Sequence, residues 1–206
     1  MKEYNTIEKQ VEGIIIEKKS KFIATVIPVE SKKQAEEKIK EIKKKYMDAR
    51  HNCYAYCVLE EENIITKSSD DGEPSGTAGI PILKAITENS LCNVVVVVTR
   101  YFGGILLGTG GLQRAYTSAV LEGVKNATIL KKQIGYEIEI GINYSDLNYV
   151  KYYVEQMGGK ILDINYTEKI KIKLEITETG KLEIENQDNT IGNKIQKIYK
   201  ISKKYI

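Results

Sequence analysis

A run of five consecutive valines, Val94–Val98, constrains the fold of this chain more than any other segment. A β-branched apolar run this short indicates a strand that is buried on both faces. Past the run, apolar residues return at the spacing of a helix with one buried side: Leu112, Ala115, Tyr116, Ala119, Val120 and Val124. The sequence therefore predicts a buried strand followed by an amphipathic helix.

The junction between this strand and this helix is rich in glycine. Five glycines fall within nine residues: Gly103, Gly104, Gly108, Gly110 and Gly111. Glycine allows positive φ and close approach to a neighbouring surface, and free N–H groups at a helix start favour anions. The sequence leaves two interpretations open: a phosphate-binding turn, and a turn that only packs strand against helix.

The junction matches neither of two common nucleotide-binding patterns. A P-loop needs lysine and a hydroxyl residue after its second glycine, whereas Thr109 and Gly110 follow Gly108. The dinucleotide pattern GxGxxG also fails, because GTGGLQ at 108–113 lacks the last glycine. What remains is a generic turn that suits an anion, and we predict no cofactor.

Basic and aromatic residues surround the glycines. Arg100, Tyr101 and Phe102 end the predicted strand, and Arg114 lies one turn into the predicted helix. Such residues can stack on bases and pair with phosphates. The alternative is a buried aromatic side chain beside an arginine that extends to solvent.

A second unusual segment, SSDDGEPSGTAG at 68–79, is a polar loop with three carboxylates: Asp70, Asp71 and Glu73. Twelve residues is long for a loop in a compact domain, and such loops are often functional. The spacing of its carboxylates does not match a calcium-binding loop, and we predict no metal site. A role in binding or catalysis is favoured over an ordinary turn.

His51 is the only histidine, and it shares one face of a predicted strand with Cys53. This pattern favours a core position for Cys53 over a thiol–imidazole pair or a zinc site, so no catalytic residue is predicted.

The three cysteines include no CxxC pair, and no segment resembles a signal peptide or a membrane span. A cytoplasmic protein without membrane attachment is expected. A net charge of +3 is too small to identify nucleic acid as a partner.

The chain divides by composition near residue 133. The first part predicts strands at Val11–Ile16 and Phe22–Val29, a helix capped by Ser31, and strands at His51–Leu59 and Asn63–Lys67. The second part predicts the order β-α-β-β-α-β, which is that of a ferredoxin-like unit. We therefore expect an α+β protein with domains at 1–132 and 133–206.

Three segments together resemble a known family: DARHNCYAY at 48–56, SSDDGEPSGTAGIP at 68–81 and VTRYFGGILLGTGGLQRAY at 98–116. They are similar to the signature blocks of the IMPACT family, in its bacterial two-domain, YigZ-like form. The resemblance implies a first domain like domain 2 of ribosomal protein S5. It implies a ferredoxin-like second domain, similar to domain V of the translocation factor EF-G.

The resemblance also implies a link to translation. Eukaryotic relatives regulate translation by restraining an amino-acid-sensing kinase through an additional RWD domain, for which 206 residues leave no room. The leading hypothesis is therefore a non-enzymatic, regulatory factor that binds RNA or the ribosome. Its binding residues would come from the strand end and the glycine turn: Arg100, Tyr101, Phe102, Gly103, Gly104, Gly108, Gly110, Gly111 and Arg114.

Two other functions stay open. An enzyme acting on a phosphorylated small molecule or nucleotide would hold phosphate at the glycine turn and use Asp70, Asp71 or Glu73 as a metal ligand or base. That function requires the acidic loop and the glycine turn to face each other across a pocket. A protein-interaction module would instead use the exposed edge of the ferredoxin-like sheet.

Overall fold

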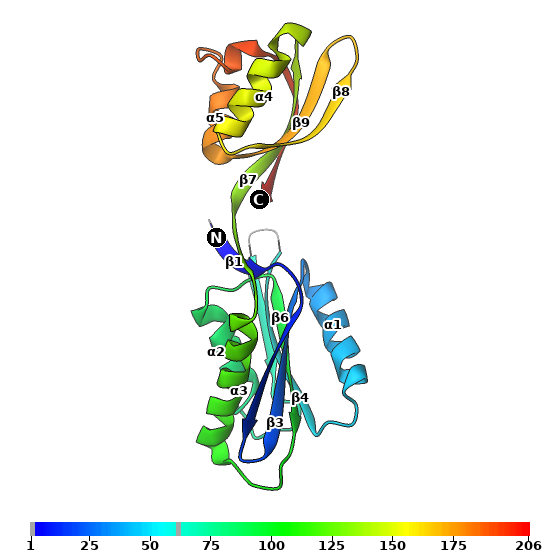
Figure 1. Cartoon of the computed structure of the whole chain (residues 1–206), viewed down its shortest axis with the longest axis vertical. Helices are drawn as coiled ribbons and strands as arrows, with labels where there is room; N and C mark the ends of the chain where they lie inside the picture. Colours follow the sequence, from blue (N-terminus) through cyan, green and yellow to red (C-terminus); the bar gives the residue numbers. More distant parts are fainter. Residues whose placement is uncertain (1–2, 61–62) are drawn as a thin grey trace. The chain divides into compact units, whose positions relative to one another are not determined.

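The computed structural model describes residues 3–60 and 63–206. The chain forms two compact units, an N-terminal unit of residues 3–131 and a C-terminal unit of residues 132–206 (Figure 1). Both mix helices with antiparallel sheet, so the predicted α+β class is confirmed. Within the described residues, no helix is both long and apolar enough to span a membrane.

The N-terminal unit is built on a five-stranded sheet with strand order β2-β3-β6-β4-β5. Every neighbouring pair is antiparallel, and β6 lies at the centre. All five valines of β6 are completely buried, as their sequence pattern predicts. The strands are β2 (Val11–Glu17), β3 (Ser20–Pro28), β4 (His51–Glu60), β5 (Asn63–Ser69) and β6 (Val94–Tyr101).

Helices cover both faces of this sheet (Figure 1). On one face, α1 (Lys32–Lys45) packs Ile39 and Ile42 into a cluster that contains Val95 and Val97. On the other face lie α2 (Gly79–Glu88) and α3 (Gly108–Lys125). Because side chains alternate along a strand, only a sheet covered on both sides can bury five valines in a row.

Local signals place several elements of this unit. The Ser31 hydroxyl accepts a hydrogen bond from the Gln34 N–H and caps α1, as predicted. The sequence did not predict β1 (Glu3–Ile7). Asn5 of β1 exchanges backbone hydrogen bonds with Ser90 and Cys92, so β1 depends on partners about 85 residues away in sequence, which no local pattern reveals.

The C-terminal unit has the predicted β-α-β-β-α-β order, with strand order β10-β7-β9-β8. This arrangement confirms the ferredoxin-like topology. Ile138, Ile140, Ile172 and Leu174 form the centre of its core. The elements are β7 (Ile129–Ile142), α4 (Leu147–Gln156), β8 (Lys160–Tyr166), β9 (Ile170–Thr177), α5 (Glu178–Glu185) and β10 (Ile195–Tyr205), with 3-10 turns at Tyr144–Asp146 and Gly192–Lys194.

Candidate functional site

The acidic loop and the glycine turn converge on one cavity of the N-terminal unit, with a volume of about 530 Å³. A cavity of this size is in the range of small-molecule and cofactor sites. It is lined by Arg50, His51, Gly72, Glu73, Pro74, Arg100, Phe102, Leu106, Leu107, Gly108, Thr109 and Leu112. Each of the three signature segments therefore contributes to its wall.

Strand register explains why segments so distant in sequence meet here. His51 at the start of β4 pairs with Arg100 near the end of β6. Arg100 lies on the same face of β6 as Val98 and Val96, because side chains two residues apart in a strand point the same way. It therefore faces α2 and α3 rather than α1. The loops that follow β5 and β6 leave the sheet at the same end, because these two strands run in the same direction. Residues of both loops line the cavity together with the start of α3.

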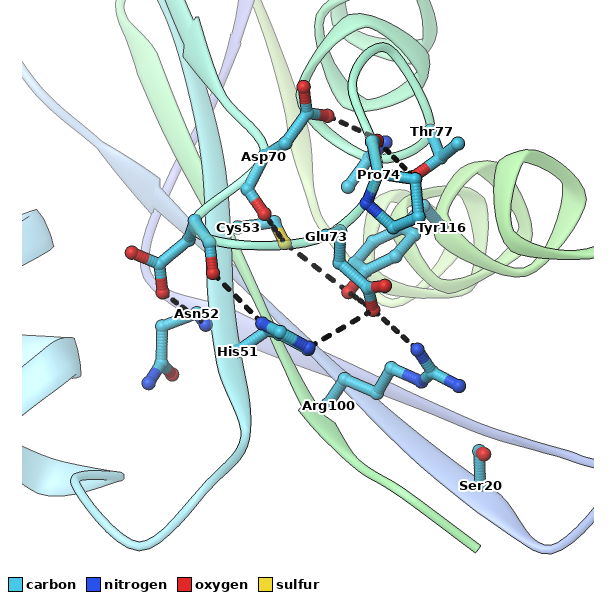
Figure 2. Close-up of polar contacts among 12 residues, drawn as sticks. Ser20, His51, Asn52, Cys53, Asp70, Glu73, Pro74, Thr77, Arg100 and Tyr116 are labelled. Atoms are coloured by element: carbon cyan, nitrogen blue, oxygen red, sulfur yellow. Dashed lines mark hydrogen bonds and ion pairs between the residues drawn. The ribbon is translucent and has the colours of Figure 1, made fainter. Parts of the chain in front are cut away.

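Glu73 is the centre of a buried polar network (Figure 2). Its Oε1 atom accepts a hydrogen bond from Arg100 Nη1 at 2.5 Å and from the Tyr116 hydroxyl at 2.9 Å. His51 Nε2 lies 4.0 Å from the same oxygen. The side chains of Glu73 and Arg100 are only 3% and 6% exposed, so this ion pair is held in a medium of low polarity.

The other two carboxylates of the loop have structural partners. Asp70 accepts hydrogen bonds from the backbone N–H groups of Gly76, Ala78 and Gly79, and so closes the loop onto the start of α2. Burial tends to raise the pKa of Asp70, but these three donors outweigh it and lower the pKa below its usual value. Asp71 accepts from the Asn52 N–H at 2.7 Å and pairs with Lys43.

Arg100 lies close to two aromatic rings. Its guanidinium carbon lies 5.4 Å from the centre of the Phe22 ring and 5.5 Å from that of Phe102. Arg50 approaches Phe102 as well, at 5.2 Å. Phe102 is 36% exposed. Two arginines and a partly exposed aromatic ring therefore border the cavity together.

The five glycines of the turn serve different purposes. A Cβ on Gly103 would lie 2.0 Å from the backbone of Lys19, so this position requires glycine for close packing. Gly104 and Gly108 have φ of +84° and +71° with open space around them, and they reverse the chain. Gly110 and Gly111 lie inside the first turn of α3. The packing interpretation of the turn thus applies at Gly103.

The predicted binding residues do not form one surface. Arg100, Phe102 and Gly108 line the cavity, together with Glu73 of the acidic loop. The Tyr101 hydroxyl instead donates to Asp48 at 3.0 Å. Arg114 borders two other hollows on the surface of α3. Arg50 was not predicted, although it precedes His51 in the first signature segment, and that position is the signal that could have found it.

Cys53 is completely buried and is not among the residues that line the cavity. Its sulfur is within hydrogen-bond distance of the Tyr116 hydroxyl and of the Asp70 carbonyl, whereas His51 Nδ1 contacts the Asp71 carbonyl at 2.9 Å. Burial raises the pKa of the Cys53 thiol to about 12. Burial also raises the pKa of the Tyr116 hydroxyl well above its usual value. Both groups are neutral at physiological pH, so Cys53 is not an activated nucleophile.

Among residues 3–60 and 63–206, no group of three or more His, Cys, Asp or Glu side chains is arranged to hold a metal ion. The groups that line the cavity are two guanidinium groups, the His51 imidazole, one paired carboxylate, an aromatic ring, the Thr109 hydroxyl and the start of α3.

The sequence and the fold are similar to those of other proteins. The profile described as the Impact N-terminal domain matches residues 18–124, and that of a domain of unknown function, DUF1949, matches residues 140–187. IMPACT family member YvyE of Bacillus subtilis is 37% identical over 85% of this chain and 80% of its own. IMPACT family member YigZ of Escherichia coli is 34% identical over 72% of this chain and 74% of its own. A solved structure of a hypothetical protein covers 98% of both chains at 28% identity and a TM-score of 0.63.

Proposed function

This chain belongs to the IMPACT family, and from that premise we propose that it is a non-enzymatic, translation-associated factor that binds RNA, as a free strand or within the ribosome. The cavity of the N-terminal unit and its rim are the proposed binding surface. The observation that carries this proposal is the pairing of Arg50 with the partly exposed ring of Phe102 at that cavity.

This pairing has the chemistry that single-stranded RNA requires. A base can stack on an exposed aromatic ring, and an arginine beside the ring can pair with the adjoining phosphate. Ile105 and Leu106 follow Phe102 and are 42% and 81% exposed, so the apolar rim extends along the glycine turn. Exposed apolar side chains grouped beside a cationic residue are typical of a binding surface.

The charge of the chain limits the expected mode of binding. A net charge of +3 gives only weak overall attraction to a polyanion. Binding should therefore involve a few phosphates, and log K should fall with log salt by about 0.7 for each phosphate neutralised on a single strand.

A titration of labelled single-stranded RNA, followed by fluorescence anisotropy at low salt, tests the proposal. Because one base–aromatic stack contributes about 1–3 kcal/mol, Phe102→Ala should weaken binding roughly 5- to 150-fold. Lys125→Ala removes an exposed cation at the other end of α3 and is the control. Absence of saturable binding, or an equal effect of the two substitutions, would contradict the proposal.

One observation favours the enzyme alternative. Glu73 and Gly108 line the same cavity, so the acidic loop and the glycine turn do face each other as that function requires. The carboxylate of Glu73 is already engaged by Arg100 and Tyr116, however, and Asp70 and Asp71 have structural partners. Release of phosphate from nucleotides in the presence of Mg²⁺, abolished by Glu73→Gln, would favour the enzyme over the binding factor.

A further inference from the structure

We propose that the cavity contains a subsite for a terminal phosphate group, formed by Arg100 and the first residues of α3. This inference rests on the proposed function, because the ligand would be the 5′-phosphate of an RNA strand or of a free nucleotide. It adds a chemical class of ligand and the groups that recognise it.

The first observation is that most hydrogen-bond donors of Arg100 are unused. A guanidinium group has five N–H donors, and within the described part of the chain the side chain of Arg100 makes one hydrogen bond, to Glu73. Its Nε atom is buried without any partner among those residues. Buried polar groups nearly always have partners, so a buried donor without one at a cavity wall indicates a missing ligand or ordered water.

The second observation concerns the start of α3, an 18-residue helix. No side chain caps its first N–H groups, and its first turn contains no acidic residue. Gly108 and Thr109 of this turn line the cavity. The free N–H groups and the positive end of the helix dipole therefore lie at the same cavity as the unused donors of Arg100.

The charges at the cavity favour an anion. Among its lining residues, Arg50 and Arg100 carry positive charge and Glu73 is the one carboxylate. That carboxylate is already bound by Arg100 and Tyr116, which reduces its repulsion of an incoming anion. The remaining positive charge comes from Arg50 and from the helix start.

A terminal phosphate suits this arrangement better than a phosphate within a strand. Arg100 is 6% exposed, so its ligand must reach into the cavity, and a strand that entered would also have to leave. A phosphomonoester carries more charge than a diester and forms stronger bonds with an arginine fork. Pro74, Leu107 and Leu112 supply an apolar wall for the attached nucleoside.

The test compares two RNA strands of the same sequence, one with a 5′-phosphate and one with a 5′-hydroxyl, by anisotropy. We expect the phosphorylated strand to bind about tenfold more tightly, which corresponds to one well-placed charge-assisted hydrogen bond. Thr109→Glu should remove this preference by placing a carboxylate at the helix start. The same substitution stabilises a helix N-terminus, so loss of the preference would not reflect unfolding.

Two matched variants and one double variant complete the design. Ser118→Glu adds the same charge to an exposed position of α3 outside the cavity lining and should keep the preference. Thr109→Gln is the neutral equivalent of Thr109→Glu and should retain most of the preference. Combining Arg100→Gln with Glu73→Gln removes both buried charges together, which avoids an unpaired charge, and should abolish the preference.

Competition distinguishes the two sources of the phosphate. Adenosine monophosphate should displace the 5′-phosphorylated strand, whereas adenosine should not. If the strand binds more tightly than the monophosphate, the ligand of the subsite is the end of an RNA strand. If the monophosphate binds more tightly, the ligand is a free nucleotide. Equal displacement by adenosine and its monophosphate would overturn the subsite.

The outcomes separate this inference from the proposed function. If both strands bind with equal affinity, the phosphate subsite is overturned and the RNA-binding function stands. If neither strand binds but the monophosphate does, the subsite stands and the RNA-binding function fails. If nothing binds, both fail.

Discussion

Arg100 donates a hydrogen bond of 2.5 Å to Glu73, and the two residues come from segments 27 positions apart in the sequence. Burial makes this ion pair costly to break from one side, because the remaining charge would have no partner in a medium of low polarity. The ion pair also fixes both side chains at the wall of the cavity. The same ion pair therefore contributes to stability and to the shape of the cavity.

Glu73→Ala should lower the free energy of unfolding by about 3–5 kcal/mol, because it leaves the guanidinium of Arg100 buried and unpaired. Glu73→Gln keeps an acceptor for Arg100 and Tyr116 and should cost less. Urea denaturation followed by circular dichroism measures both. The control is Glu88→Ala, which breaks an exposed ion pair with Lys84 and should change stability by less than about 1 kcal/mol. An equal effect of Glu73→Ala and Glu88→Ala would show that the buried pair is not stabilising.

Two alanine substitutions in the glycine turn should have opposite effects on stability. Gly103→Ala would bring a Cβ within 2.0 Å of the Lys19 backbone, so the β2–β3 turn would have to move and stability should fall. Gly110→Ala lies in the first turn of α3, where the nearest atom belongs to the flexible side chain of Arg114 at 3.5 Å. It should raise stability by about 0.5–1 kcal/mol, because alanine loses less backbone entropy than glycine. Thermal melting shows whether each variant is more or less stable than wild type. A stabilising effect of Gly103→Ala would contradict the close packing at that position.

Asp70 should make the stability of the N-terminal unit depend on pH in the acid range. Its pKa is lowered in the folded state, so its contribution is fully present above the unfolded pKa of about 3.9 and is lost as pH falls through the folded pKa. Asp70→Asn should cost about 1–3 kcal/mol at pH 7, because an amide cannot accept from all three N–H groups. The difference from wild type should shrink below about pH 4.

Urea denaturation at pH 7 and pH 3 measures this difference. Asp188→Asn, at an exposed position of the C-terminal unit, is the control and should show little change at either pH. A difference between wild type and Asp70→Asn that stays constant with pH would contradict the assigned role of Asp70.

Cys53 should resist alkylation in the folded protein. With a pKa of about 12, only about one Cys53 thiol in ten thousand is ionised at pH 8. Iodoacetamide at that pH should therefore modify Cys53 only after unfolding, as mass spectrometry of peptides would show. Ser118→Cys supplies an exposed reference thiol on α3 that should react quickly in the same sample. Rapid native modification of Cys53 would indicate an activated thiol instead.

Arg50 and Arg114 should differ in their effect on RNA binding. Arg50 borders the cavity, whereas Arg114 borders other hollows on α3. Arg50→Ala should weaken binding and reduce the salt dependence by about one phosphate, or ~0.7 in slope. Arg114→Ala should leave the slope close to that of wild type. Equal slopes for the two variants would show that the binding surface extends across α3, as the sequence alone suggested.

The sequence by itself determined the elements that depend on local patterns. The valine run determined a strand buried on both faces, and Ser31 determined the start of α1. The spacing of apolar residues determined α3 and the order of elements in the C-terminal unit. These predictions succeeded because the periods of helix and strand and the chemistry of caps act over a few residues.

Only the tertiary structure decided which residues of the unusual segments share a site. Asp70, Asp71 and Glu73 are equivalent as a sequence pattern, yet two are satisfied by nearby backbone or lysine, and one pairs with Arg100 at the cavity. Arg50 and Arg100 meet because β4 and β6 are neighbours in the sheet. The partners of a charged group, and hence its burial and its chemistry, are set by contacts between distant segments, and local patterns carry no record of them.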